Sequence, residues 1–566
     1  MQHLQVLLDN GFTPIDLDQQ ILVASRIKLQ QIPLSKRIYS NLKDQAKSRI
    51  DDFFLNNELP STSQQTFTNK QNPDEPLRGV PGFYTEEGYD SIFLEQSLAL
   101  AKNALQDVWI YGEEDTPSNL DPDVIHAELE SLYIKDFIKY WTNLYKSIKM
   151  PRLNSIQETV DVLESLAGPD KALEAVIDAI IINTDLRARP TALQKAGDVL
   201  AKNRIGGKAA KKARKATKKI NKDTPLTPVG QRLTKHFKEL IALNSSVDGK
   251  PAALATYTQS LTAMQNYLLA IAEAAEPEDA ALKASIQRMQ NNGQDAIGKL
   301  NRQLRRLPSP VKQWVASLTD AAWRLMLRTS RTQINNLWKN NVIPRYQQDI
   351  ENRYPVFKRA QQQLSIDNFA RFFAPGAVMP EFIGQNIAPF IKKSAVAWKL
   401  KTLEGRNLSI SSANLQQLRR SDTILKAYFP EGAKDPMVTF QFKPQKLDRS
   451  VSKAVLNLDG NEFFYQHGPA VFTEILQWPY DDPERSRASL SFDTSKGQFV
   501  ISRNGAWAIF KLLETGTVKR IKRSNNRFAV KFVIEDQTAI YELRAASSLN
   551  PFNLNGVHLF RCPSTL

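Results

Sequence analysis

Residues 352–390 decide the fold, and they read NRYPVFKRAQQQLSIDNFARFFAPGAVMPEFIGQNIAPF. Before this stretch, apolar residues recur every three or four positions, which is typical of helices. After about Met437 they alternate with polar residues, which is typical of half-buried strands. The sequence therefore predicts an α+β multidomain protein, with a large all-helical N-terminal region followed by a C-terminal β-sandwich-like domain.

The stretch also predicts its own local structure. Pro355 disfavours the helical conformation for the residue before it, so the preceding helix should end near Tyr354. Ser365 can cap a short new helix, because its hydroxyl can accept a hydrogen bond from a free backbone N–H. The apolar face of that helix would be Ile366, Phe369 and Phe373, and Pro375-Gly376 would end it. On physical grounds alone, core packing explains these aromatic residues best.

The flanking regions carry equally local signals. Asp121-Pro122 should open a long helix, whose apolar stripe includes Tyr133, Phe137 and Trp141. Asp459-Gly460 between two alternating runs is a strong hairpin signal. We divide the chain into a helical region at 1–150, a second at 151–350 that holds a basic segment at 206–224, a helical connector at 351–422 and the β-rich domain at 423–566.

Bulk composition limits the class of protein. The chain has 566 residues, 42% of them hydrophobic, which suffices for several cores. No apolar run approaches the ~20 residues of a membrane span, and the N-terminus has no signal-peptide pattern. Either the protein stays where it is made or the chain is a piece of something longer. Cys562 is the single cysteine, so an intramolecular disulfide is excluded.

The net charge of +16 suits an anionic partner. Seven basic residues gather between Lys208 and Lys219, which indicates a segment for phosphate or lipid headgroups, or simply a solvated loop or helix. A basic nucleic-acid-binding module is therefore an alternative function. No aromatic residue interrupts the run, so base stacking there is not expected.

A search for catalytic chemistry finds no constellation. The five histidines are too far apart in sequence for a helical zinc site, and the sequence has no Gly-x-Ser-x-Gly elbow. Gly206-Gly207-Lys208 is followed by Ala209, so it is not a phosphate-binding loop. Acidic pairs such as Asp481-Asp482 could act on a glycan, although solvated loop acids are far more common. We predict no enzyme, no cofactor and no metal.

A series of motifs resembles the IcmF/TssM family of type VI secretion. Each motif is weak, but they follow the family's order along nearly the whole chain. They are Arg26-x-x-Leu29, 32–39, 80–89, Tyr133-x-x-x-Phe137 with Tyr140-Trp141, Arg353-Tyr354-Pro355, 369–376, 382–390, 456–460, 465–469, Trp478-Pro479, 505–512 and Asn550-Pro551-Phe552.

The resemblance implies the periplasmic region of a bacterial inner-membrane protein, a structural subunit of the type VI secretion membrane core complex. It implies docking of a TssJ-like outer-membrane lipoprotein, contact with a TssL-like inner-membrane subunit through the family's N-terminal part, and self-association into a multimeric complex. The family's membrane spans and nucleotide-binding-type domain have no counterpart here, and its usual Trp-Pro-Gly becomes Trp478-Pro479-Tyr480.

The loop at 477–483 is the candidate docking site. Sandwich loops are common binding surfaces, and rigid aromatic anchors lose little entropy on binding. We predict a role in partner binding for Trp478, Pro479, Tyr480, Asp481 and Asp482. The competing interpretation is that Trp478 plugs the sandwich core.

Overall fold

The computed structural model describes residues 18–72, 74–103, 121–186, 227–245, 252–394, 396–430, 433–553 and 556–566. The chain forms two compact units. Unit 1 comprises Met1–Ala270 and Ala296–Ala322, and unit 2 comprises Ile271–Asp295 and Trp323–Leu566. The two helices α13 (Ala253–Ala272) and α16 (Val311–Leu337) contribute residues to both. The basic segment at 208–219 lies outside the described residues.

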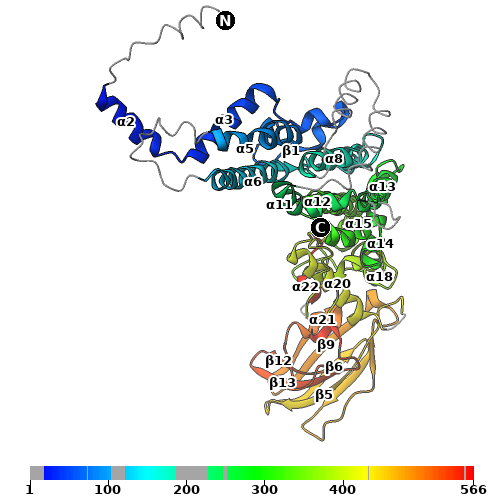
Figure 1. Ribbon diagram of the computed structural model, residues 1–566. Coiled ribbons are helices and arrows are strands. Elements are labelled where there is room, and N and C mark those ends of the chain that lie inside the picture. The colour runs from blue at the N-terminus through cyan, green and yellow to red at the C-terminus, as the bar shows by residue number, and fades with distance from the viewer. Residues whose placement is uncertain are drawn as a thin grey trace, which may run out of the picture. The chain divides into compact units, whose positions relative to one another are not determined.

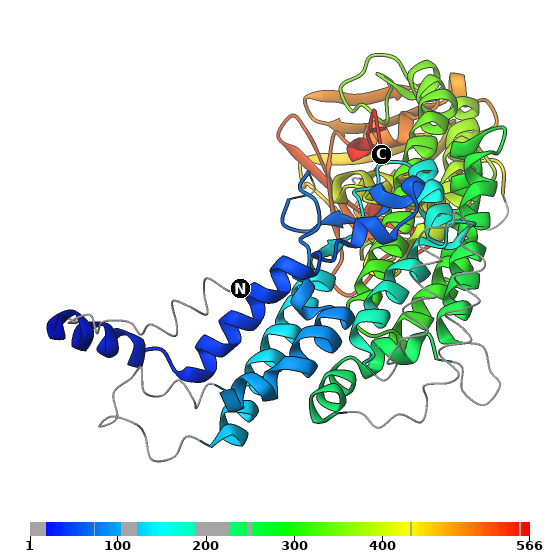
Figure 2. The ribbon, with the colours of Figure 1, turned by 45° about the horizontal axis from the view of Figure 1, so that its top comes forward.

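Unit 1 is built from helices (Figure 1). Besides α13 and α16, its described α-helices are α2 (Gln19–Gln30), α3 (Leu34–Arg49), α4 (Glu86–Gly88), α5 (Glu95–Asn103), α6 (Pro122–Ser147), α7 (Ile156–Ala167), α8 (Ala172–Thr184), α11 (Pro228–His236), α12 (Lys238–Leu243) and α15 (Ala296–Gln303). Figure 2 shows α3, α5 and α6 running alongside one another, and these three helices pack in pairs. A short antiparallel pair, β1 (Thr68–Asn69) with β2 (Ile148–Lys149), adds to them.

Helix α6 begins as the sequence predicts. The Asp121 carboxylate accepts a hydrogen bond from the Asp123 backbone N–H at 2.9 Å, and Pro122 occupies the first turn, where its missing N–H costs nothing. The predicted stripe is buried, and its polar tips are satisfied. The Trp141 indole donates to the Tyr84 carbonyl at 2.7 Å, and the Tyr133 hydroxyl donates to the Phe83 carbonyl at 3.0 Å. These aromatic residues are core.

Unit 2 combines helices with two sheets. Its helices are α14 (Pro277–Gln290), α17 (Ile343–Arg345), α18 (Ile366–Phe373), α19 (Val378–Phe382), α20 (Ser412–Tyr428), α21 (Ala508–Leu513) and α22 (Gly556–Leu559). The Ser365 hydroxyl caps α18 by accepting from the Asn368 N–H at 3.2 Å, as predicted. Phe369 and Phe373 are fully buried, and the Phe369 ring lies 5.2 Å from that of Trp507. The stretch at 352–390 thus lies in the core of unit 2.

The strands form a four-stranded sheet in the order β10-β9-β6-β7 and a five-stranded sheet in the order β11-β12-β13-β5-β8, all antiparallel. Their bounds are β5 (Val438–Leu447), β6 (Val451–Leu458), β7 (Asn461–Tyr465), β8 (Leu476–Trp478), β9 (Arg487–Thr494), β10 (Gly497–Asn504), β11 (Thr517–Arg520), β12 (Arg527–Ile534) and β13 (Gln537–Ala545). A separate pair joins β3 (Ile391–Lys392) and β4 (Lys399–Leu400).

The predicted hairpin connects β6 and β7. Asp459 and Gly460 have φ of 55° and 88°, and Leu458 pairs with Asn461 across the turn. Both turn residues have positive φ, which Gly adopts at no cost and Asp tolerates. Along β5, β9 and β12, alternate side chains are buried. The C-terminal β-sandwich-like architecture is therefore as predicted.

One boundary differs from the sequence prediction. Gln477 and Trp478 belong to strand β8 rather than to a loop, because Val438 and Thr439 of β5 pair with them. The division of the chain into four domains stays a prediction. Among the described residues, no helix is long and apolar enough to cross a membrane.

Candidate functional site

The structure places Trp478 inside the β-rich region. Its side chain is buried, and its indole N–H donates to the Ala506 carbonyl at 2.7 Å. The rings of Trp507 and Phe510 lie 4.7 and 5.1 Å from its own, centroid to centroid. A buried indole with a satisfied N–H is a packing element. This is the environment expected for a tryptophan that plugs the core.

The predicted site residues that follow Trp478 become progressively more exposed to solvent. Pro479 and Tyr480 are half-buried, and burial raises the pKa of the Tyr480 phenol. Asp481 and Asp482 are exposed, and the Asp482 carboxylate lies 3.7 Å from the Arg485 guanidinium. The segment therefore offers carboxylates to solvent and keeps its large rings inside. Its role in partner binding stays a prediction.

A second surface lies on the chain between β7 and β8, which are edge strands of the two sheets. Val471 and Ile475, between the two strands, are 74% and 71% exposed, and among the described large apolar side chains only Val396 is more exposed. Val471 and Ile475 are four positions apart in the chain, and neighbouring exposed apolar side chains mark interaction sites more often than isolated ones do. We name Val471 and Ile475 the β7–β8 surface.

Three hydrogen bonds hold the connection between β7 and β8 against β5. The Thr473 N–H donates to the Phe442 carbonyl at 2.8 Å, and the Phe442 N–H donates to the Thr473 hydroxyl at 3.0 Å. The Gln441 side-chain amide donates to the Thr473 carbonyl at 2.8 Å. Thr473 therefore holds the connection in one place.

Phe472 provides a second anchor beside Thr473. The Arg544 guanidinium lies 3.8 Å from the centroid of the Phe472 ring, and the Lys443 ammonium lies 5.4 Å from it. Cations over an aromatic face attract it by ~0.5–1 kcal/mol at exposed sites. Because these contacts fix Phe472 and Thr473, the backbone that carries Val471 and Ile475 is ordered.

A buried carboxylate supports this anchor. Glu542 accepts from the Arg527 Nε at 2.6 Å and from the Gln445 side-chain amide at 3.2 Å, and it lies 3.8 Å from Arg544. The hydrogen bond from Arg527 holds the pKa of Glu542 below its usual range. Glu542 thus stays ionised and fixes the cation that holds Phe472.

Exposed aliphatic side chains on an ordered backbone suit the binding of a protein partner. No group of three metal-ligating side chains forms among the described residues. His467, predicted as a turn residue, has a φ of 61° and contacts the Val451 carbonyl at 2.8 Å through Nε2. Sequence reasoning missed the β7–β8 surface. The available signal was the apolar pair Val471-Phe472 close after Gly468-Pro469, where a loop should be polar.

Three family models match the chain, and all describe IcmF proteins. The IcmF-related model (intracellular multiplication and human macrophage-killing) matches residues 1–185. The helical domain of the type VI secretion protein IcmF matches residues 329–434, and its C2-like domain matches residues 440–547. The chain belongs to the IcmF/TssM family.

Among relatives of this IcmF/TssM chain, the type VI secretion system component TssM1 of Pseudomonas aeruginosa PAO1 is 27% identical over 579 aligned positions. The alignment takes in 100% of this chain and 51% of TssM1, so the chain spans about half the length of that relative.

Two solved structures share the fold of this IcmF/TssM chain. One, described as a type VI secretion system membrane core complex, is 17% identical with a TM-score of 0.64 and covers 94% of this chain and 99% of its own. The other, a type VI membrane complex, is 16% identical with a TM-score of 0.60 and covers 96% and 94%.

Proposed function

We propose that this chain is the periplasmic part of a structural subunit of the type VI secretion membrane core complex. Membership of the IcmF/TssM family and a fold shared with membrane-complex structures over more than nine-tenths of the chain support the proposal. In this role the chain has no catalytic task and no cofactor. It self-associates, and a TssL-like subunit contacts the inner-membrane part of the protein.

The β-rich region would dock a TssJ-like outer-membrane lipoprotein through the β7–β8 surface. The observation that carries this proposal is the exposure of Val471 and Ile475 on either side of the anchored Phe472–Thr473 pair. Burial of one such aliphatic side chain contributes ~1.5–3 kcal/mol. A surface that is ordered before it binds loses little entropy on association.

The exposed members of the predicted docking set fit at the rim of this site. Strand β8 begins directly after Ile475 and ends at Trp478, and Pro479 follows it. Asp481 and Asp482 are exposed beyond them. Rim charges set register and association rate more than affinity. In this proposal the acids orient the lipoprotein and the aliphatic pair holds it.

The test is direct binding between the 566-residue chain and a soluble form of a TssJ-like lipoprotein from the same genome. We expect saturable binding. Val471→Asp/Ile475→Asp should weaken it at least ~30-fold, because about 2 kcal/mol or more of apolar burial is lost. Val500→Asp is the matched control, since Val500 is 51% exposed on β10, at the other edge of the four-stranded sheet. No binding by any such lipoprotein would contradict the proposal.

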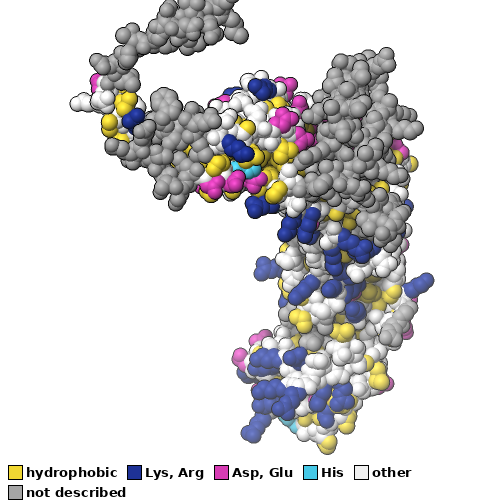
Figure 3. Space-filling view, viewed as in Figure 1, with side chains coloured by type: hydrophobic (Ala, Val, Ile, Leu, Met, Phe, Trp, Pro, Cys, Tyr) yellow, Lys and Arg dark blue, Asp and Glu magenta, His cyan; other side chains and the backbone are white. Residues whose placement is uncertain are grey.

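The second candidate function is nucleic-acid binding, motivated by the net charge of +16 and the run from Lys208 to Lys219. Figure 3 shows further Lys and Arg side chains over the β-rich region. Phosphate contacts of this kind give a steep dependence of affinity on salt. A salt-sensitive shift of duplex DNA, lost when the seven basic residues of the run become Gln, would favour this function.

A further inference from the structure

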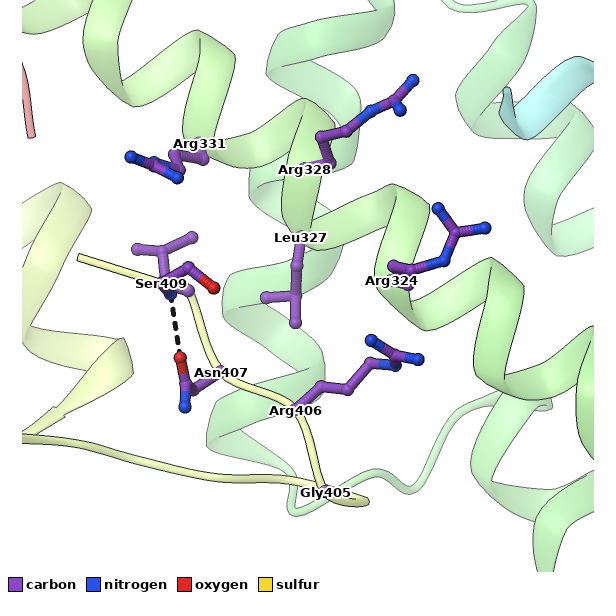
Figure 4. Close-up of a pocket in the computed structure, with 9 residues that line it drawn as sticks. Arg324, Leu327, Arg328, Arg331, Gly405, Arg406, Asn407 and Ser409 are labelled. Atoms are coloured by element: carbon purple, nitrogen blue, oxygen red, sulfur yellow. Dashed lines mark hydrogen bonds between the residues drawn. The ribbon is translucent and has the colours of Figure 1, made fainter. Parts of the chain in front are cut away.

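A row of arginines on α16 faces a loop of unit 2. Arg324, Arg328 and Arg331 follow one another at spacings of four and three, which places them on one side of the helix. With Arg406 and the rest of 405–409 they line a pocket of about 290 Å³ (Figure 4). Leu327 and Leu408 form its buried apolar floor.

The loop has a defined turn. Leu403 and Arg406 exchange backbone hydrogen bonds of 2.9 and 3.0 Å. Between them, Glu404 and Gly405 have φ of 50° and 79°, the left-handed pair that closes a two-residue turn. Beyond the turn, the Ser409 N–H donates to the Asn407 side-chain oxygen at 2.9 Å, the dashed bond in Figure 4. The backbone that carries Arg406 is therefore ordered.

A buried arginine fixes this turn from beneath. Arg288 is 1% exposed, and its guanidinium donates to the carboxylates of Asp295 and Glu404. The same guanidinium lies 4.8 Å from the ring centroid of Trp323, whose indole donates to the Leu403 carbonyl at 3.0 Å. Buried, charge-assisted contacts of this kind are strong and directional. They set the position from which Arg406 projects.

The four arginines give the pocket its chemistry. The nine residues that line it, all of them described, include four arginines and no acidic residue, so the lining has a formal charge of +4. Guanidinium groups stay protonated at any physiological pH. Figure 4 shows Arg406 reaching along the helix toward Arg324, whereas the side chains of Arg328 and Arg331 point away from this pair. Arg331 also donates through both Nε and Nη2 to the main-chain oxygen of Leu566, each at 3.3 Å, which limits its movement.

We propose that this pocket binds a compact, multiply charged oxyanion, with phosphate as the preferred group. The planar guanidinium fork matches the oxygen geometry of phosphate in a bidentate manner. A single carboxylate carries one charge, whereas a phosphate monoester or pyrophosphate carries two or more and so suits the Arg324–Arg406 pair. The ligand is a free phosphate compound or a phosphorylated headgroup, and the site is independent of lipoprotein docking.

The test titrates pyrophosphate into the 566-residue chain at low ionic strength, with calorimetry as the readout. We expect one saturable site, whose affinity falls at least tenfold in Arg324→Gln/Arg406→Gln. The matched control is Arg359→Gln/Arg523→Gln, which removes the same charge from exposed positions of unit 2 outside the pocket. Both variants keep the Lys208–Lys219 run, so the difference between them reports on the pocket.

A second variant distinguishes loss of binding from loss of folding. Asn407→Asp keeps the side-chain oxygen that accepts from Ser409 and places a negative charge in the pocket. It should weaken pyrophosphate binding while the melting temperature without ligand stays unchanged. Vesicles with phosphate-monoester headgroups, compared with neutral vesicles, distinguish a lipid source from a free ion. The proposal is overturned if pyrophosphate shows no saturable site, if the control loses as much affinity as the pocket variant, or if only a poly-Glu peptide binds.

Discussion

The chain before β8 and the chain from the end of β8 onward differ in the burial of their apolar side chains. At the end of β8 Trp478 is buried, and its indole donates to the Ala506 carbonyl, while Tyr480 just after the strand is half-buried. Before it, Val471 and Ile475 turn outward, because Phe472 and Thr473 hold the connection against β5 and β13. Large rings next to prolines thus serve the core, and smaller aliphatic side chains form the exposed surface. Anchoring contacts, rather than residue size, decide which segment can meet a partner.

The largest effect expected from this comparison is on folding. Trp478→Ala should cost ~3–5 kcal/mol of the free energy of unfolding, because it leaves a cavity beside Trp507 and Phe510. Urea unfolding of the 566-residue chain, followed over the transition of unit 2, measures it.

Ile475→Ser is the control for this experiment, and its free energy of unfolding should stay within about 0.5 kcal/mol of the wild type, because Ile475 is exposed. A Trp478→Ala protein as stable as the wild type would mean that Trp478 does not support the core. That result would favour the prediction that Trp478 contacts a binding partner.

Much of the fold was predictable because its signals are local. The Ser365 cap, the Asp121-Pro122 helix start and the Asp459-Gly460 turn each depend on residues close in sequence, and all three occur as predicted. The β7–β8 surface was not predictable. Its exposure depends on Arg544, which reaches Phe472 from 72 positions along the chain. The sequence pattern shows which residues are apolar. It does not show which of them a side chain from a distant part of the sequence will cover.

A second prediction concerns Glu542, which fixes Arg544. Because its pKa is lowered in the folded chain, its ionised form stabilises the fold above the ordinary glutamate pKa of ~4.3, and this contribution is lost as pH falls through the lower folded-state value. Glu542→Gln should therefore cost ~1–2 kcal/mol at pH 7, the half-exposed Arg527 limiting the effect.

Urea unfolding of Glu542→Gln and wild type at pH 7 and at pH 3 checks the sign. The difference between the two proteins should shrink on acidification. A difference that grows at pH 3 would show that the carboxylate is not held in its ionised form.

A smaller effect is expected at the anchor itself. Phe472→Ala should cost only ~0.5–1 kcal/mol of stability, the size of a partly exposed cation–π contact. It should nevertheless weaken lipoprotein binding, since Val471 and Ile475 would lose their fixed backbone. Amide hydrogen exchange should rise at 466–475 in this variant. Unchanged exchange would mean that Thr473 alone orders the connection.

The most direct test of the account measures lipoprotein affinity for two variants that leave the core intact. One is Val471→Asp/Ile475→Asp, before β8, and the other is Asp481→Asn/Asp482→Asn, after it. We predict that the first weakens binding of a TssJ-like lipoprotein at least ~30-fold and that the second changes it less than about threefold, because apolar burial sets affinity and rim charges mainly set rate. The reverse order, in folded proteins, would place docking on the segment after β8 and contradict the account.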